Sequence, residues 1–280
     1  MSNRISQAGK QAARMRLRAE REQQQKKEKV RRQLIAGGAI VALLAVVGGI
    51  GVAVATSGGG SSGSGAGTWA KAPSAKLVRP AHTTGKNGTD LVIGKKDAQH
   101  TLTLFEDPRC PYCAKFDQNL GETIQKDISD GKYKASFRLG TFLDDSSQGT
   151  GSKNALSAMG AALNVGPDAF LAYKAALFSK EYHPEEAGPD KFADNDYLLK
   201  VAGTVPALKG NAKFRDAVQA GTYHRWALEM SKRFNSFKVP TPTVKLDDKA
   251  LGTDTPDGKA APSSPDAFNA EVDKAMKAKS

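Results

Sequence analysis

Cysteine is the scarcest reactive residue of this chain, with only Cys110 and Cys113 among 280 residues. Two cysteines are too few for the disulfide frameworks that hold small secreted proteins together. A structural zinc site usually needs four ligands, and the four histidines are scattered without the spacing of metal ligands. We therefore expect no metal and no organic cofactor, and the paired cysteines need another explanation.

Acidic and aromatic residues are rare near the N-terminus. The first 33 residues hold 11 Lys or Arg against 3 Glu, so this tail carries +8 of the chain's net charge of +12. It contains no aromatic residue that could stack on nucleic-acid bases. We predict that residues 1–33 form a basic cytoplasmic tail with anionic lipid, and not nucleic acid, as its partner.

Charged residues are missing from Leu34–Ala55, a run of 22 residues. A helix of that length spans roughly 33 Å, enough for a bilayer core of about 30 Å. The basic residues before it place the N-terminus in the cytoplasm and the rest of the chain outside, by the positive-inside rule. The sequence predicts a single transmembrane helix at residues 34–56 in a cell-membrane protein with an extracytoplasmic catalytic domain.

Two alternatives remain open for this segment. Ala53-Val54-Ala55 has the small-x-small pattern of a signal-peptide cleavage site, although signal peptides usually have apolar regions of about 7–15 residues. Arg31-Arg32 bears a weak likeness to a twin-arginine export signal. Beyond the segment, residues 57–68 are a flexible Gly/Ser linker, and residues 69–280 remain for a folded domain.

The folded part alternates between strand-like and helix-like patterns. Alternating apolar residues predict strands at 101–105, 133–139 and 243–246, with a weaker candidate at 91–93. Helical periodicity predicts helices in the remaining stretches, namely 112–128, 154–164, 168–180, 198–202, 211–220, 223–234 and a last one from Ser264-Pro265 onward. This order favours an α/β fold with a mixed sheet and helices on its faces.

Apolar repeats predict which helix faces are buried. Tyr112, Phe116, Leu120, Ile124 and Ile128 recur every four residues, which predicts one buried face on the helix that follows the cysteines. In the stretch 223–234 a similar repeat of Trp226, Met230 and Phe234 predicts core packing.

The cysteines stand where the strand 101–105 gives way to this helix, in the segment FEDPRCPYCAKF. Pro111 suits the first helical position, which makes Cys110 the N-cap. Unpaired N–H groups and the helix dipole at that end favour thiolate over thiol. Cys113 lies one turn further in, where it is better shielded and stays protonated longer. We predict a redox-active Cys110–Cys113 pair in which Cys110 is the nucleophile and Cys113 resolves the mixed disulfide.

Other roles for this segment stay open. The CPYC pair could form an inert structural disulfide in a tethered binding or scaffold module, although so small a loop constrains the unfolded chain little. Glu106 and Asp107 could relay protons to the cysteines. Asp107-Pro108 is also an ordinary way for a chain to leave a strand.

The segment resembles the active-site region of extracytoplasmic, thioredoxin-fold oxidoreductases of the Dsb type (DsbA-like). The matching positions are Phe105, Asp107-Pro108 and Cys110-Pro111-Tyr112-Cys113. The family's second motif, a cis-proline loop before a strand, is matched by Thr241-Pro242-Thr243, with Pro240 as a competing candidate for the cis bond.

The resemblance covers roughly residues 91–278 and implies a thioredoxin-like mixed sheet. The stretch 153–234 resembles the helical subdomain inserted in this family, which here would occupy about 150–236.

The resemblance also implies a function. Such a protein oxidises the thiols of exported proteins and is re-oxidised by a membrane partner, which is quinone-linked in this family. Pro111, Tyr112, Thr241 and Pro242 would bind the client, whose extended backbone would lie along Thr241 and Pro242. The Pro-Tyr dipeptide is shared with the more reducing glutaredoxins, so a reductase or isomerase remains an alternative.

Overall fold

The computed structural model describes residues 69–146, 149–185, 188–255 and 258–278. All of them fall within one compact unit. The predicted basic tail, transmembrane helix and linker lie outside the described residues. Within the described ranges, no helix is both long enough and apolar enough to span a bilayer.

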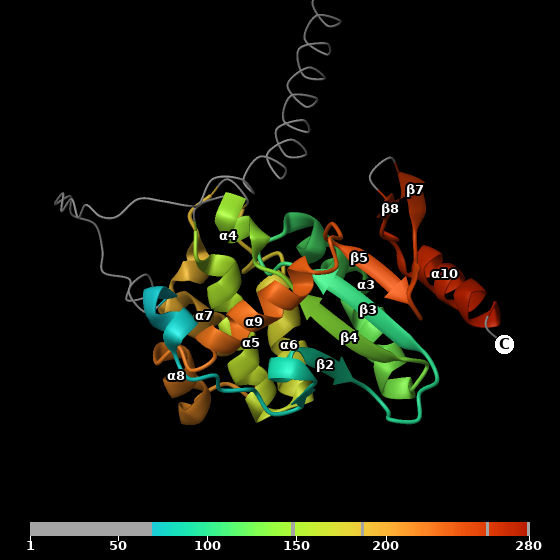
Figure 1. The fold of residues 1–280 in the computed structure, drawn as a ribbon. Helices are drawn as coiled ribbons and strands as arrows, with labels where there is room; N and C mark the ends of the chain where they lie inside the picture. The colour runs from blue at the N-terminus through green and yellow to red at the C-terminus, as the bar shows by residue number, and fades with distance from the viewer. Residues whose placement is uncertain (1–68, 147–148, 186–187, 256–257, 279–280) are drawn as a thin grey trace, which may run out of the picture. The chain divides into compact units, whose positions relative to one another are not determined.

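A six-stranded mixed sheet forms the centre of this unit (Figure 1). Strands β3 and β4 are parallel, and every other neighbouring pair is antiparallel. The spatial order is β1 (Thr83–Thr84), β2 (Asp90–Ile93), β4 (Lys134–Leu139), β3 (Thr101–Glu106), β5 (Thr243–Leu246) and β6 (Lys249–Ala250). The predicted mixed sheet and its four predicted strands are confirmed.

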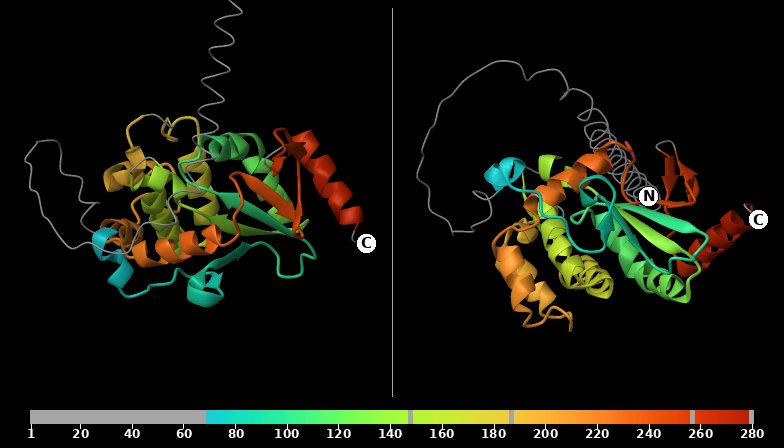
Figure 2. Two further views of the ribbon diagram at one scale, coloured as in Figure 1. Left: turned by 45° about the horizontal axis from the view of Figure 1, so that its top comes forward. Right: turned by 60° about the horizontal axis from the view of Figure 1, so that its bottom comes forward.

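Helices surround the sheet, and most of them lie between β4 and β5 in the chain. This stretch holds α4 (Phe142–Ser146), α5 (Gly151–Val165), α6 (Pro167–Phe178), α7 (Asn195–Ala202), α8 (Ala212–Gln219) and α9 (His224–Asn235). The two others are α3 (Pro111–Asp130), which follows β3, and α10 (Pro265–Lys277), which packs against α3 and β5. Two further views show α5 and α6 side by side (Figure 2), in agreement with their packing.

Aromatic side chains fill the space between the sheet and the helices. Phe137 of β4 and Phe170 of α6 are buried and meet edge to face, with ring centroids 5.2 Å apart. Trp226 of α9 is also fully buried, and its indole N–H donates to the Gly88 carbonyl at 2.7 Å. Met230 and Phe234 are buried beside it, so the predicted core stripe of α9 is confirmed.

The predicted buried face of α3 is confirmed except at its first residue, Tyr112. Phe116, Leu120, Ile124 and Ile128 are buried, but Tyr112 is 74% exposed. With 3.6 residues per turn, each four-residue step turns the side chain by about 40°. The repeat therefore drifts around the helix, and Tyr112, at its far end, faces solvent.

Several short elements were not predicted. These are α4, the two-residue strands β1 and β6, and a separate hairpin of β7 (Thr253–Thr255) and β8 (Gly258–Ala260). Helix α7 also begins earlier than predicted, because the Asp194 carboxylate caps it by accepting from Asp196 N at 2.9 Å. By contrast, the predicted cap of α10 is confirmed, since Ser264 Oγ accepts from Ala267 N.

Replacing Phe170 with alanine should lower the free energy of unfolding by about 3–5 kcal/mol, because the change leaves a cavity between α6 and the sheet. The same truncation at the exposed Tyr112 should change it by less than about 0.5 kcal/mol. Chemical denaturation of the two variants measures the difference. Equal losses would contradict the packing described here.

Candidate active site

Cys110 caps the N-terminus of α3, as predicted. Its backbone is extended (φ −70°, ψ 117°), and α3 begins at Pro111. The Cys110 Sγ atom accepts a hydrogen bond from Cys113 N at 3.4 Å. One of the unpaired N–H groups of the first helical turn therefore points at this sulfur.

The register of the sheet brings a distant loop to the same sulfur. Strands β3 and β5 are antiparallel, with Phe105 opposite Thr243. The residues just before Thr243 therefore lie beside the loop that follows β3. The Thr241–Pro242 peptide bond is cis, which confirms Pro242 over Pro240. Thr241 Oγ1 donates to Cys110 Sγ at 3.5 Å, and the Thr241 carbonyl oxygen lies 3.9 Å from the same atom.

These donors lower the pKa of the Cys110 thiol. The largest effect comes from the Cys113 thiol, which donates a hydrogen bond to the Cys110 sulfur. Burial acts in the opposite direction, and the Thr241 hydroxyl and Cys113 N–H lower the pKa further. Cys110 is therefore the better thiolate of the pair.

Cys113 has the opposite environment. Burial raises its pKa, as do the hydrogen bond it donates to Cys110 and the nearby charges of Cys110 and Glu106. Cys113 has no exposed surface, whereas Cys110 keeps 4% of its own. Cys110 is therefore the more accessible residue of the two.

The immediate surroundings of the two cysteines are apolar on one side. Phe178 of α6 and Ala114 form a buried cluster with them, and Leu143 of α4 packs against it. Of the predicted client-contacting residues, Pro111, Thr241 and Pro242 are partly exposed and Tyr112 is largely exposed. The fold thus gathers all six predicted site residues at the N-terminal end of α3.

A buried carboxylate lies at the end of β3, four residues before Cys110. Glu106 is fully buried, and its Oε1 atom lies 3.0 Å from the Lys174 ammonium. Lys174 also donates to Asp117 at 2.6 Å. Burial raises the pKa of Glu106 to about 7, Lys174 opposes this effect, and Asp117 adds to it. The Oε2 atom has no hydrogen-bond partner among the described residues.

Asp107, which follows Glu106, holds the loop before Cys110 in place through hydrogen bonds. Its Oδ1 atom accepts from Ser152 Oγ at 2.6 Å and from Arg109 N at 2.9 Å, and Oδ2 accepts from Leu143 N at 3.1 Å. Burial nevertheless raises the pKa of Asp107 to about 6. The loop before Cys110 is thereby attached to α4 and α5.

Arg109 adds an ion-pair network that the sequence analysis missed. The guanidinium lies 3.3 Å from Asp144 and 3.2 Å from Asp190. Both carboxylates also accept from two backbone N–H groups each, at Thr150 and in the first turn of α5 that follows it. A side chain at Gly151 would clash with Asp190, its Cβ falling 1.9 Å from Oδ1. No local pattern signals this network, because its residues meet only in the folded chain.

The arrangement of groups around Cys110 and Cys113 is suited to thiol–disulfide exchange. It has a thiol with a lowered pKa, a buried thiol beside it, and a loop that offers backbone groups to a partner. No cluster of metal-ligating side chains occurs in the described part of the chain.

Comparison with known proteins places this site in a family. A family model described as Thioredoxin matches residues 86–274. The chain belongs to this thioredoxin family. Reduced DsbA from Mycobacterium tuberculosis has a similar fold, with a TM-score of 0.54 and 23% identity over 67% of this chain and 92% of that chain. The expected DsbA-like thioredoxin fold is confirmed.

Two curated relatives match parts of the chain. Disulfide bond formation protein D of Bacillus subtilis is 35% identical over 96 residues, 34% of this chain and 41% of that protein. Serine/threonine-protein kinase PknE of Mycobacterium tuberculosis is 27% identical over 158 residues, 54% of this chain and 27% of the kinase. The chain thus spans less than half the length of either relative. The prediction of a thiol–disulfide oxidoreductase agrees with the relative named for disulfide bond formation.

Replacing Thr241 with valine should raise the pKa of Cys110, because the hydroxyl donor to the thiolate is lost while the side-chain shape is kept. The pH dependence of thiol alkylation measures this change. Thr243→Val is the control, because the Thr243 hydroxyl donates to the Pro240 carbonyl and not to sulfur. An unchanged Cys110 pKa in Thr241→Val would contradict the assigned role of the hydroxyl.

The raised pKa of Glu106 predicts how stability depends on pH. The carboxyl is disfavoured in its charged form, so its contribution is fully present below its ordinary pKa of 4.5 and is lost as pH rises through about 7. In Glu106→Gln the free energy of unfolding should fall less over this pH range than in the native chain. The exposed Glu122→Gln should behave like the native chain, and identical profiles for all three proteins would refute the assignment.

Proposed function

We propose that this protein is a membrane-anchored thiol–disulfide oxidoreductase that oxidises the thiols of exported proteins. The observation that carries the proposal is the stabilised sulfur of Cys110. It lies at the N-terminus of α3 and accepts hydrogen bonds from Cys113 N and the Thr241 hydroxyl. An oxidant needs a stable reduced form, and a stabilised thiolate provides one.

In the first step, a client thiolate attacks Cys110 Sγ of the oxidised pair. The Cys110–Cys113 bond breaks, a mixed disulfide forms with Cys110, and Cys113 leaves with the electron pair. The high pKa of Cys113 means that this sulfur then takes up a proton. Glu106 is buried, its charge acts on Cys113, and its pKa of about 7 suits it to supply that proton.

In the second step, another thiolate of the client attacks the client sulfur of the mixed disulfide. The client disulfide forms and Cys110 leaves as a thiolate. Donation from Cys113 and Thr241 favours this leaving group. The enzyme is then a dithiol with two extra electrons, which a membrane partner of the quinone-linked kind would remove.

Pro111, Tyr112, Thr241 and Pro242 would hold the client while this exchange takes place. Pro242 has no N–H, and the Thr241 carbonyl borders the reactive sulfur. An extended client chain could pair with the backbone of this loop, as in strand addition. The exposed ring of Tyr112 offers an apolar contact next to Cys110.

Anchoring and orientation follow from the sequence. A single helix at residues 34–56 would place the catalytic domain outside the cytoplasm, where disulfides persist. The tail at residues 1–33 would contact anionic lipid.

Trapping tests this function against the alternative of an inert scaffold. In cells that express Cys113→Ala, the Cys110 thiolate should attack the disulfides of exported proteins and stay joined to them, because the Cys113 thiol that would displace the client from Cys110 is missing. Cys110→Ala should trap none, since the remaining thiol is buried. Equal trapping by the two variants would overturn the assigned roles.

A lack of trapping in both variants, together with an ordinary alkylation pKa for Cys110, would favour the scaffold.

A further inference from the structure

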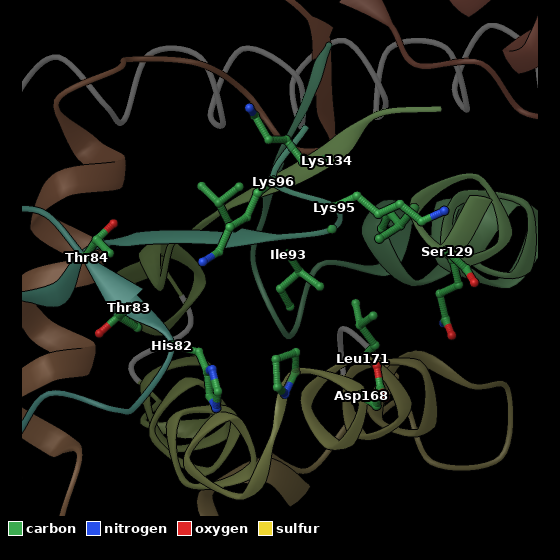
Figure 3. A pocket seen from close by; sticks show the side chains of 15 residues that line it. His82, Thr83, Thr84, Ile93, Lys95, Lys96, Ser129, Lys134, Asp168 and Leu171 are labelled. Carbon is green, nitrogen blue, oxygen red and sulfur yellow. The ribbon is translucent and has the colours of Figure 1, made fainter. Parts of the chain in front are cut away.

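A groove lies at the far edge of the sheet from β5 and the cis-proline loop, where β2 ends (Figure 3). It has a volume of about 770 Å³ and is open to solvent. Figure 3 shows His82, Thr83 and Thr84 at one end and Ser129 at the other, with Leu171 of α6 opposite Ile93. None of its lining residues belongs to the redox site.

Strand β2, which borders this groove, is paired along most of its length on one side but only in part on the other. Leu91, Val92 and Ile93 all have register partners on β4. On its other side, β2 pairs with β1 only at Asp90 and Leu91. Within the described residues, Val92 and Ile93 therefore have no partner on that side. An unpaired strand edge of this kind is a template for another extended chain.

Apolar surface accompanies this free edge. The Val92 side chain is 41% exposed, one of few large apolar side chains exposed in the described part of the chain. Leu171 is partly buried and lines the opposite wall. Alternate side chains of an added strand would point toward the groove, so apolar residues at every second position would fit it.

The charges at the groove are mostly positive. Lys95, Lys96 and Lys134 line it, whereas Asp168 is its only carboxylate. Lys95 and Lys134 donate to backbone carbonyl oxygens, and Lys95 also lies close enough to the Asp130 carboxylate to lower its pKa. Lys96 has no hydrogen bond or ion pair with any described residue. The groove is therefore complementary to an acidic ligand.

We propose that this groove binds an extended acidic segment of a partner protein, which adds to the free edge of β2 as a new strand. Backbone pairing with Val92 and Ile93 would supply affinity, and the lysines would select for carboxylates. A second copy of this chain fits poorly, because like charges would then face each other across the edge. An anionic lipid could contact the lysines, but it has no peptide groups to pair with the strand.

Hydrogen exchange of the full chain tests the proposal, with the peptide acetyl-Glu-Val-Glu-Val-Glu-Val-amide as the probe. Saturating peptide should slow exchange of whichever of the Val92 and Ile93 amides faces away from β4 by about tenfold or more, because an added strand protects it. The same peptide with alternate backbone nitrogens methylated should not protect it. A lysine-for-glutamate version should bind at least about tenfold more weakly.

A charge-reversed pair of variants provides the matched control. Lys96→Glu should weaken peptide binding about tenfold, and Lys213→Glu, an equal charge change on α8 outside the groove, should not. Binding without amide protection would overturn the proposal in favour of simple anion attraction. Protection by phosphatidylglycerol vesicles but not by the peptide would overturn it in favour of lipid. None of these outcomes depends on the cysteines, so the proposed redox function is tested separately.

Discussion

The stabilisation of one sulfur atom at the end of a helix is the interaction on which the rest of this structure depends. Cys110 Sγ receives donors from its own helix and from Thr241, a residue 131 positions away in the chain. The second donor arrives only because β3 and β5 pair with Phe105 opposite Thr243. A register shift of one residue would turn the strand's side chains to the other face and displace this loop. The central sheet thus sets the chemistry of the cysteine.

Buried charge supports the same site from behind. Glu106 is paired with Lys174, which also contacts Asp117. Arg109 joins the loop before Cys110 to Asp144 and Asp190, whose carboxylates hold the start of α5. Charges in such places are costly unless they are paired. Glu106 illustrates the balance, because its proximity to Lys174 only partly offsets the effect of burial on its pKa. The helices between β4 and β5 therefore do more than cover the sheet, since they carry partners of both Glu106, the last residue of β3, and Asp107, which follows it.

Local patterns in the sequence predicted the parts of the site that depend on local physics. Pro111 after Cys110 predicted the helix cap, and Ser264-Pro265 did the same for α10, because capping involves residues only a few positions apart. The cis-proline loop was predicted from a family resemblance and not from the residues alone. Tyr112 was misplaced because a four-residue repeat does not match the helical period. The contacts of Asp107 and Arg109, and the half-paired edge of β2, arise between distant residues, and no spacing in the sequence reveals them.

The reduction potential of the Cys110–Cys113 pair tests the central claim most directly. The full chain would be equilibrated in glutathione buffers of known composition, and its dithiol fraction measured by thiol alkylation and mass spectrometry. If the Cys110 thiolate stabilises the reduced form, the potential should lie above about −200 mV, on the side of DsbA at about −120 mV. A value more negative than that, toward about −270 mV for thioredoxin, would contradict the account of this protein as an oxidant.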